Sequence, residues 1–215
     1  MRIIGSLFLT VVFLFLMNRS LTGPQIHEYL ALFFGVILIL HLLYTKTWRR
    51  RVFFQNALGS YVKDFLHMLF FFVLLITMVS GALISTSLFP SVHLRGIVSI
   101  WVHEIHQSAG YGSFILAGIH YGLHWKKIWA RVKKYFGFFS CKKQYKYISL
   151  GTACIFIAYA VYASFLNHIG DRILMEHMVN IGVDDSALKY TGNMWMIFFG
   201  YAIFSGLLQY FMEKR

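Results

Sequence analysis

Histidine is the residue type in this sequence whose number and spacing could carry chemistry. Seven of the ten histidines lie in or at the edges of three apolar stretches: His27, His41, His67, His103, His106, His120 and His124. An ionisable side chain inside a membrane-crossing helix is costly, and it is a functional candidate for that reason. A neutral imidazole is also the commonest protein ligand of metal ions. The clustering therefore predicts a metal-binding site.

The spacing of four of these histidines indicates two levels of ligands. His41 follows His27 by 14 residues, and His120 follows His106 by the same interval. In an α-helix such an interval returns to within about 40° of the starting face and separates the two rings by about 21 Å. If the two helices run in the same direction, His27 faces His106 near one membrane surface and His41 faces His120 near the other. This frame fits two haems, each held between two imidazoles.

The other histidines leave alternatives open. His124 follows His106 by 18 residues, which is about five turns, so it could take the place of His120. Pairing of His103 with His124 is a weaker alternative. His67 lies near the beginning of its own stretch, at the expected cytoplasmic end. It could form a quinone or proton site with His124, and the alternative is that both are interfacial histidines.

The elements that must hold these side chains are apolar helices. Apolar residues make up 58% of the 215 residues and charged residues 13%, against about 45–50% and about 25% in soluble proteins. This composition excludes a disordered chain, a nucleic-acid-binding arm and an ordinary soluble enzyme. Two prolines and no alternating pattern argue for helices rather than a barrel. Two unpaired cysteines and the absence of Cys-x-x-Cys-His exclude a disulfide framework, a thiolate metal site and covalently attached haem.

Six stretches approach the roughly 20 residues that a helix needs to cross a bilayer. They are 3–18, 26–45, 65–88, 98–124, 147–167 and 192–212. We therefore predict an all-α membrane bundle of six transmembrane helices. A four-helix di-haem core occupies 1–129, and 130–215 adds a basic cytoplasmic loop and two further helices.

Basic residues set the direction of this bundle. Of the 20 Lys and Arg residues, all but Arg19, Arg95, Arg172 and Lys189 fall in the termini and loops of one side. Because basic loops stay in the cytoplasm, both termini are expected there. The formal net charge of +12 is explained by this topology, and no nucleic-acid partner is expected.

Smaller features carry their own expectations. Glu28 follows His27 directly and lies near a helix start. A carboxylate at such a position most often caps the helix or interacts with its dipole. The alternative is that Glu28 accepts a proton beside a quinol site. Gly110, Gly112 and Gly118 allow close helix packing or make room for a flat macrocycle.

Two polar segments join the predicted spans. The basic, aromatic run 126–146 is expected to hold topology and attract anionic lipid, with docking of a flavoprotein as the alternative. The segment 167–193 is expected to form a short amphipathic helix and an acidic turn.

Three segments carry a resemblance to a known family. They are SLTGPQIHEYLALFFGVILILHLLYTKTW (20–48), MVSGALIS (78–85) and IHQSAGYGSFILAGIHYGLHW (105–125). Over residues 1–129 the chain resembles the small bacterial membrane cytochromes b that are catalogued as a domain of unknown function, which are similar in plan to other bis-histidine di-haem cytochromes b. One departure is Leu30-Ala31, where the family often has Leu-Gly. The last two predicted spans lie outside the resemblance.

The resemblance implies two haem b groups, ligated by His27 and His106 on the outer side and by His41 and His120 on the inner side. It implies electron transfer across the bacterial cytoplasmic membrane, with a flavoprotein, a cytochrome or quinone as redox partner. The fifth and sixth helices could add lipid or subunit contacts, so an oligomer is compatible with this plan.

Two other functions are alternatives to electron carriage. One is a quinol-oxidising or ferric-reducing subunit of an oxidoreductase, with His67, His124 or Glu104 at a substrate pocket. The other is a transporter with a histidine-lined path, which would require polar sites at the midplane and broken helices. Bis-histidine ligation leaves no open position on the iron, and this favours electron transfer over chemistry at the metal.

Overall fold

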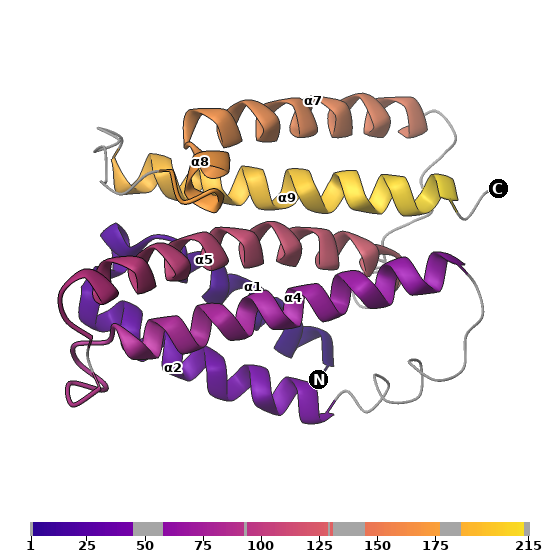
Figure 1. Ribbon diagram of the computed structural model, residues 1–215. Helices are drawn as coiled ribbons and strands as arrows, with labels where there is room; N and C mark the ends of the chain where they lie inside the picture. The colour runs from indigo at the N-terminus through magenta and orange to yellow at the C-terminus, as the bar shows by residue number, and fades with distance from the viewer. Residues whose placement is uncertain are drawn as a thin grey trace. The chain divides into compact units, whose positions relative to one another are not determined.

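The computed structural model of the chain describes residues 2–44, 58–92, 94–128, 130, 145–176 and 186–212, with side chains from 5–43, 61–92, 94–128, 130, 150–176 and 186–212. Within these ranges every regular element is an α-helix and no strand occurs, which confirms the expected all-α class (Figure 1). The helices are α1 (Arg2–Leu16), α2 (Arg19–Tyr44), α4 (Leu58–Leu83), α5 (Ile97–Leu123), α7 (Tyr145–Leu166), α8 (Ile169–Ile173) and α9 (Ala187–Met212).

Each of the six predicted apolar stretches overlaps one of these helices, and each helix begins before the predicted start. Among the residues that the structure describes, three helical segments are long and apolar enough to cross a membrane: Arg19–Leu43, Tyr61–Leu83 and Ala187–Met212. They place large apolar side chains on the surface, including Leu43 (69% exposed) and Phe65 (65% exposed). Apolar surface of this extent suits lipid rather than water. The chain is therefore a candidate membrane protein; the number of spans, their orientation and the boundary after residue 129 stay predictions.

The helix α2 bends near its start. Gly23 has φ 72° and ψ 164°, a left-handed backbone that glycine adopts without steric cost. Pro24 follows and supplies the fixed φ that suits the first residue of a helix. The straight, membrane-length part of α2 therefore starts at Pro24, and His27 lies in its first turn.

By its contacts the chain divides into two units, Met1–Ser113 with Asp171–Thr191, and Phe114–Gly170 with Gly192–Arg215. In the first unit α1 packs along α2, and α2 contacts α4 (Figure 1). The rings of Phe13 and Phe34 stack with centroids 5.5 Å apart between α1 and α2.

Asn18 joins the ends of several elements in the first unit. It is 2% exposed. Its Nδ2 donates to the Ala187 carbonyl at 2.8 Å and to Thr191 Oγ1 at 2.7 Å, while its Oδ1 accepts from the Leu21 amide at 3.1 Å. The last bond caps the start of α2, and the same Leu21 amide also donates to the backbone carbonyl of Asn18 at 3.1 Å. The first turn of α9 is thereby fixed to the α1–α2 junction.

One face of α5 binds the segment that contains α8. Ser108 Oγ donates to the Ile173 carbonyl at 2.6 Å, and the hydroxyls of Tyr111 and Tyr190 lie 2.5 Å apart. The Arg172 guanidinium lies 5.3 Å from the centre of the Tyr111 ring. The expected short helix in 167–193 is present as α8, whereas the acidic turn of that segment lies outside the described residues.

In the second unit, α9 packs closely against α7 and the end of α5. A Cβ at Gly200 would overlap Ala160 on α7, and a Cβ at Gly122 would overlap Ser205 and the Ala202 carbonyl on α9. At Gly118 a Cβ would lie 2.9 Å from the Phe198 carbonyl oxygen. Close helix packing thus explains Gly118, one of the small residues for which the sequence left two interpretations.

Several sequence expectations fall on parts of the chain outside the described ranges. These parts include most of the basic loop residues and the extreme termini. The expected cytoplasmic position of both termini and the docking role of 126–146 accordingly stay predictions.

Candidate metal centre

Two of the predicted ligands face each other within the first unit. His27 on α2 and His106 on α5 have ring centroids 6.4 Å apart and ring planes at 85°. Both side chains are half-buried. The residues are 79 positions apart in sequence, so only the packing of α2, α4 and α5 brings them together.

The ring of His106 is held by the backbone of α4. Its Nδ1 lies 2.9 Å from the Thr77 carbonyl oxygen. A carbonyl oxygen only accepts, so Nδ1 carries the hydrogen and donates it. In the neutral ring, Nε2 then holds a lone pair that can bind a metal. Metal-binding histidines in proteins are usually oriented by a bond of this type.

Two small residues on α4 make room for this ring. The Oγ of Ser80 lies 3.3 Å from Nδ1 of His106 while it bonds to the Ile76 carbonyl at 2.6 Å. A Cβ at Gly81 would lie 2.9 Å from Cε1 of His106 and 3.2 Å from Nδ1. The Ser80-Gly81 step therefore forms a cradle that a larger residue at position 81 would fill.

His27 is positioned by its place on α2 and by its neighbour Glu28. Within the described part of the chain, the buried Nδ1 of His27 has no hydrogen-bond partner. The carboxylate of Glu28 accepts from Ser85 Oγ at 2.7 Å and from the Ser87 amide at 2.9 Å. It also accepts from the Thr86 amide at 3.2 Å and from the Thr86 hydroxyl at 3.3 Å.

These bonds give Glu28 a role that the sequence did not indicate. The carboxylate binds amides of the loop after α4 in addition to lying near a helix start. It therefore joins the start of the straight part of α2 to the end of α4, the helix that orients His106. Glu28 thus ties the helix that carries His27 to α4, whose Thr77 carbonyl orients His106.

The donor set fits a metal held between two imidazoles. Two bonds of about 2 Å between imidazole nitrogens and a metal, plus about 1 Å from each nitrogen to its ring centre, separate the centroids by about 6 Å. The observed 6.4 Å agrees with this value. The buried nitrogen of His27 and the fixed tautomer of His106 also match what a metal between them would require.

The other predicted ligands lie in both units. His41 is half-buried in the last turn of α2, and His67 is half-buried on α4. In the second unit, His120 and His124 have ring centroids 4.6 Å apart. His120 lies in the last turn of α5, and His124 directly follows the end of that helix. The choice between the two as a ligand therefore stays open, and so does the pairing with His41.

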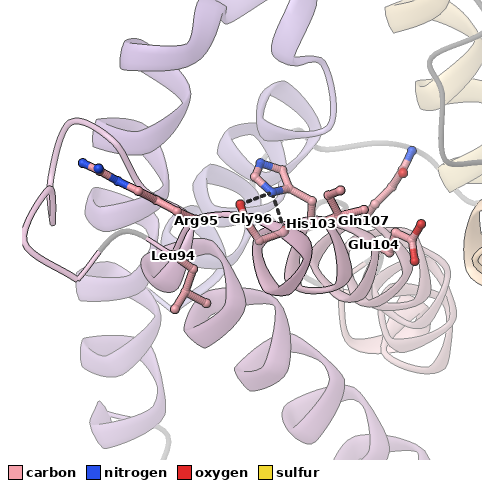
Figure 2. A pocket seen from close by; sticks show the side chains of 8 residues that line it. Leu94, Arg95, Gly96, His103, Glu104 and Gln107 are labelled. Carbon is pink, nitrogen blue, oxygen red and sulfur yellow. Dashed lines mark hydrogen bonds between the residues drawn. The ribbon is translucent and has the colours of Figure 1, made fainter.

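His103 does not belong to the facing pair of His27 and His106. Its Nδ1 donates to the carbonyl of Ser99 at 2.8 Å, one turn earlier on α5, and its side chain is exposed. The neighbouring Glu104 is buried. Both belong to a cavity of about 550 Å³ at the start of α5 (Figure 2). Its lining consists of Leu94, Arg95, Gly96, Ser99, Ile100, His103, Glu104 and Gln107.

Comparison of the chain with protein-family models, with curated proteins and with solved structures finds no match.

Proposed function

We propose that the chain is a membrane cytochrome b that carries electrons across the bacterial cytoplasmic membrane. The observation that carries this proposal is the approach of His27 and His106 to a centroid distance of 6.4 Å, with Nδ1 of His106 bonded to a backbone carbonyl. In this proposal His27 and His106 hold an outer haem b. His41 and His120 hold an inner haem b, with His124 as the alternative to His120.

A bound haem would supply a one-electron couple at this site, and the imidazoles of His27 and His106 would hold it and tune its potential. The chain's own residues fix and shield that site. The Thr77 carbonyl sets the tautomer of His106 and raises the basicity of its free nitrogen. Glu28 holds the loop 85–87 against α2, so the two imidazoles need little reorganisation during electron transfer.

The partners in this proposal are membrane lipid and a redox partner, either a protein or quinone. The six-span arrangement, the cytoplasmic termini and the membership in a cytochrome b-like family belong to the same proposal. Self-association through exposed helix faces is compatible with it. The exposed apolar side chains of α2 and α4 support a lipid environment.

A reduced-minus-oxidised absorption spectrum of the purified protein, with a pyridine haemochrome count, tests the proposal. Two low-spin b-type haems per chain are expected. One haem would mean that one level of histidines is misassigned. Absence of haem from protein made in a host that supplies haem would refute the proposal. It would favour the alternative of a transporter with a histidine-lined path.

A further inference from the structure

A basic side chain lies at the junction of α1 and α2. Arg19 is the first residue of α2, and its side chain is exposed. It directly follows Asn18, which is 2% exposed and donates to the Ala187 carbonyl and to Thr191. Because Asn18 is buried and hydrogen-bonded on both sides, the backbone at this junction is held in place. The base of the Arg19 side chain therefore has a fixed position.

The charge of Arg19 acts on the facing histidines. Its guanidinium interacts electrostatically with the imidazoles of both His27 and His106. The Leu16 carbonyl at the end of α1 also acts on His27, which places that imidazole beside the same junction. An exposed charge is largely screened beyond about 10 Å in salt solution. The guanidinium of Arg19 is therefore a local feature of the imidazole pair.

Arg19 is also an exception to the distribution of basic residues. All but four of the 20 Lys and Arg residues fall on the side predicted to be cytoplasmic, and a basic residue on the opposite side opposes that topology. Another exception, Arg172, lies against the Tyr111 ring. Among the described residues no carboxylate pairs with Arg19. A guanidinium on this side, next to two candidate metal ligands, favours an anionic group on the ligand that they hold.

We propose that the guanidinium of Arg19 pairs with a carboxylate of the haem held by His27 and His106, and that its charge raises the reduction potential of that haem. The inference rests on the proposed function and adds a positioning residue to the same site. Haem b carries carboxylates at one edge of its ring, and a guanidinium binds a carboxylate through two parallel hydrogen bonds. Because reduction adds an electron to the iron, a nearby positive charge stabilises the reduced form.

Arg19→Gln tests the effect on the potential. Wild type and variant in lipid nanodiscs are titrated potentiometrically, and the absorbance of the reduced haems is followed. Removing one charge near the iron should shift the reduction equilibrium of the outer haem about ten-fold toward the oxidised form, which corresponds to about 59 mV. The potential of the inner haem should change much less. Arg19→Lys keeps the charge and is expected to restore most of the outer potential.

Arg95→Gln is the matched control, because Arg95 is an exposed arginine on the same predicted side of the membrane. Its two potentials are expected to equal those of wild type. In a His106→Ala background, which should keep only the inner haem, Arg19→Gln is expected to leave the remaining potential unchanged. An unchanged outer potential in Arg19→Gln, or an equal fall in Arg95→Gln, would overturn the inference.

Esterified haem separates a direct pair from a general effect of charge. Apoprotein from a haem-deficient host is titrated with haem b and with its dimethyl ester, in which neither carboxyl group can ionise. The titration uses a His120→Ala background, which is expected to keep only the outer site. With Arg19 present, the ester should bind about ten-fold more weakly than haem b. With Arg19→Gln added, the two should bind equally. The same preference for haem b with and without Arg19 would overturn the pairing.

The haem count of each sample separates this inference from the proposed function. Two haems with unchanged potentials in Arg19→Gln would refute only the role of Arg19. Wild type without haem would refute the proposed function and, with it, this inference.

Discussion

Gly81→Ala is expected to disturb the facing histidine pair through a single methyl group. The added Cβ would lie 2.9 Å from Cε1 of His106, and an ordinary contact begins at about 3.4 Å. The ring must therefore move by about 0.5 Å, the difference between these distances. Its bond of 2.9 Å to the Thr77 carbonyl then stretches or breaks, and the ring turns away from His27.

The size of the effect follows from the cost of overpacking. An extra methyl group in a packed site costs about 1–3 kcal/mol, which corresponds to about a 5- to 150-fold loss of haem affinity at this site. Alanine is a better helix former than glycine by about 0.5–1 kcal/mol. The overall stability of the chain should accordingly change little while haem binding weakens.

The assay is a pyridine haemochrome count and a potentiometric titration of the purified variant. Gly35→Ala is the matched control: its Cβ would lie 2.8 Å from Cε of Met78, the far end of a flexible side chain that can move aside. We expect Gly35→Ala to retain full haem and an unchanged potential. A Gly81→Ala protein with the haem content and potentials of wild type would refute the reasoning, as would an equal loss in both variants.

Three further predictions concern other residues. His106→Ala should remove the outer haem and leave the inner one, whereas His120→Ala should remove the inner haem and leave the outer one. A haemochrome count of two haems in both variants would contradict the proposed pairing. Glu28→Gln replaces one carboxylate oxygen by an amide group that cannot accept a hydrogen bond. The Ser87 amide should then exchange its hydrogen about ten-fold faster, measured by hydrogen–deuterium exchange mass spectrometry. Unchanged exchange would show that the carboxylate does not protect this amide. Asn18→Ala removes two hydrogen bonds to the start of α9 and the cap of α2, at about 2–3 kcal/mol. Its melting temperature in detergent should fall by about 5–10 °C, and a fall of less than about 1 °C would show that these bonds add little net stability.

The positions of the helices follow from the sequence, because apolar runs of about 20 residues have one stable conformation in lipid. Each expected stretch overlaps a helix, although the bounds differ by up to seven residues. The stretch predicted at 65–88 forms a helix from Leu58 to Leu83. The chain then turns through Ser85 and Ser87, because their side-chain or backbone donors bind Glu28. A local pattern of apolar residues carries no information about such a distant acceptor.

The histidine spacing identified His27 and His106 as candidate ligands without a structure, because the helical period relates residues on one chain segment. The periods do not reveal what orients the rings. Thr77 contributes only its carbonyl group, which every residue has, and Gly81 contributes the absence of a side chain. Ser80 and Gly81 lie in the segment 78–85 that carries the family resemblance, but the sequence did not reveal their closeness to His106.

The sequence by itself determined the helical class, the approximate helix positions and the candidate ligand histidines. Composition and helical period are local properties, so these conclusions did not require knowledge of packing. Only the tertiary structure decided which imidazoles face each other, which tautomer His106 adopts and that Glu28 binds the loop 85–87. Those features depend on the rotation and register of helices that are far apart in sequence. Rotation and register are fixed by side-chain packing and hydrogen bonds between the helices, which form only in the folded protein.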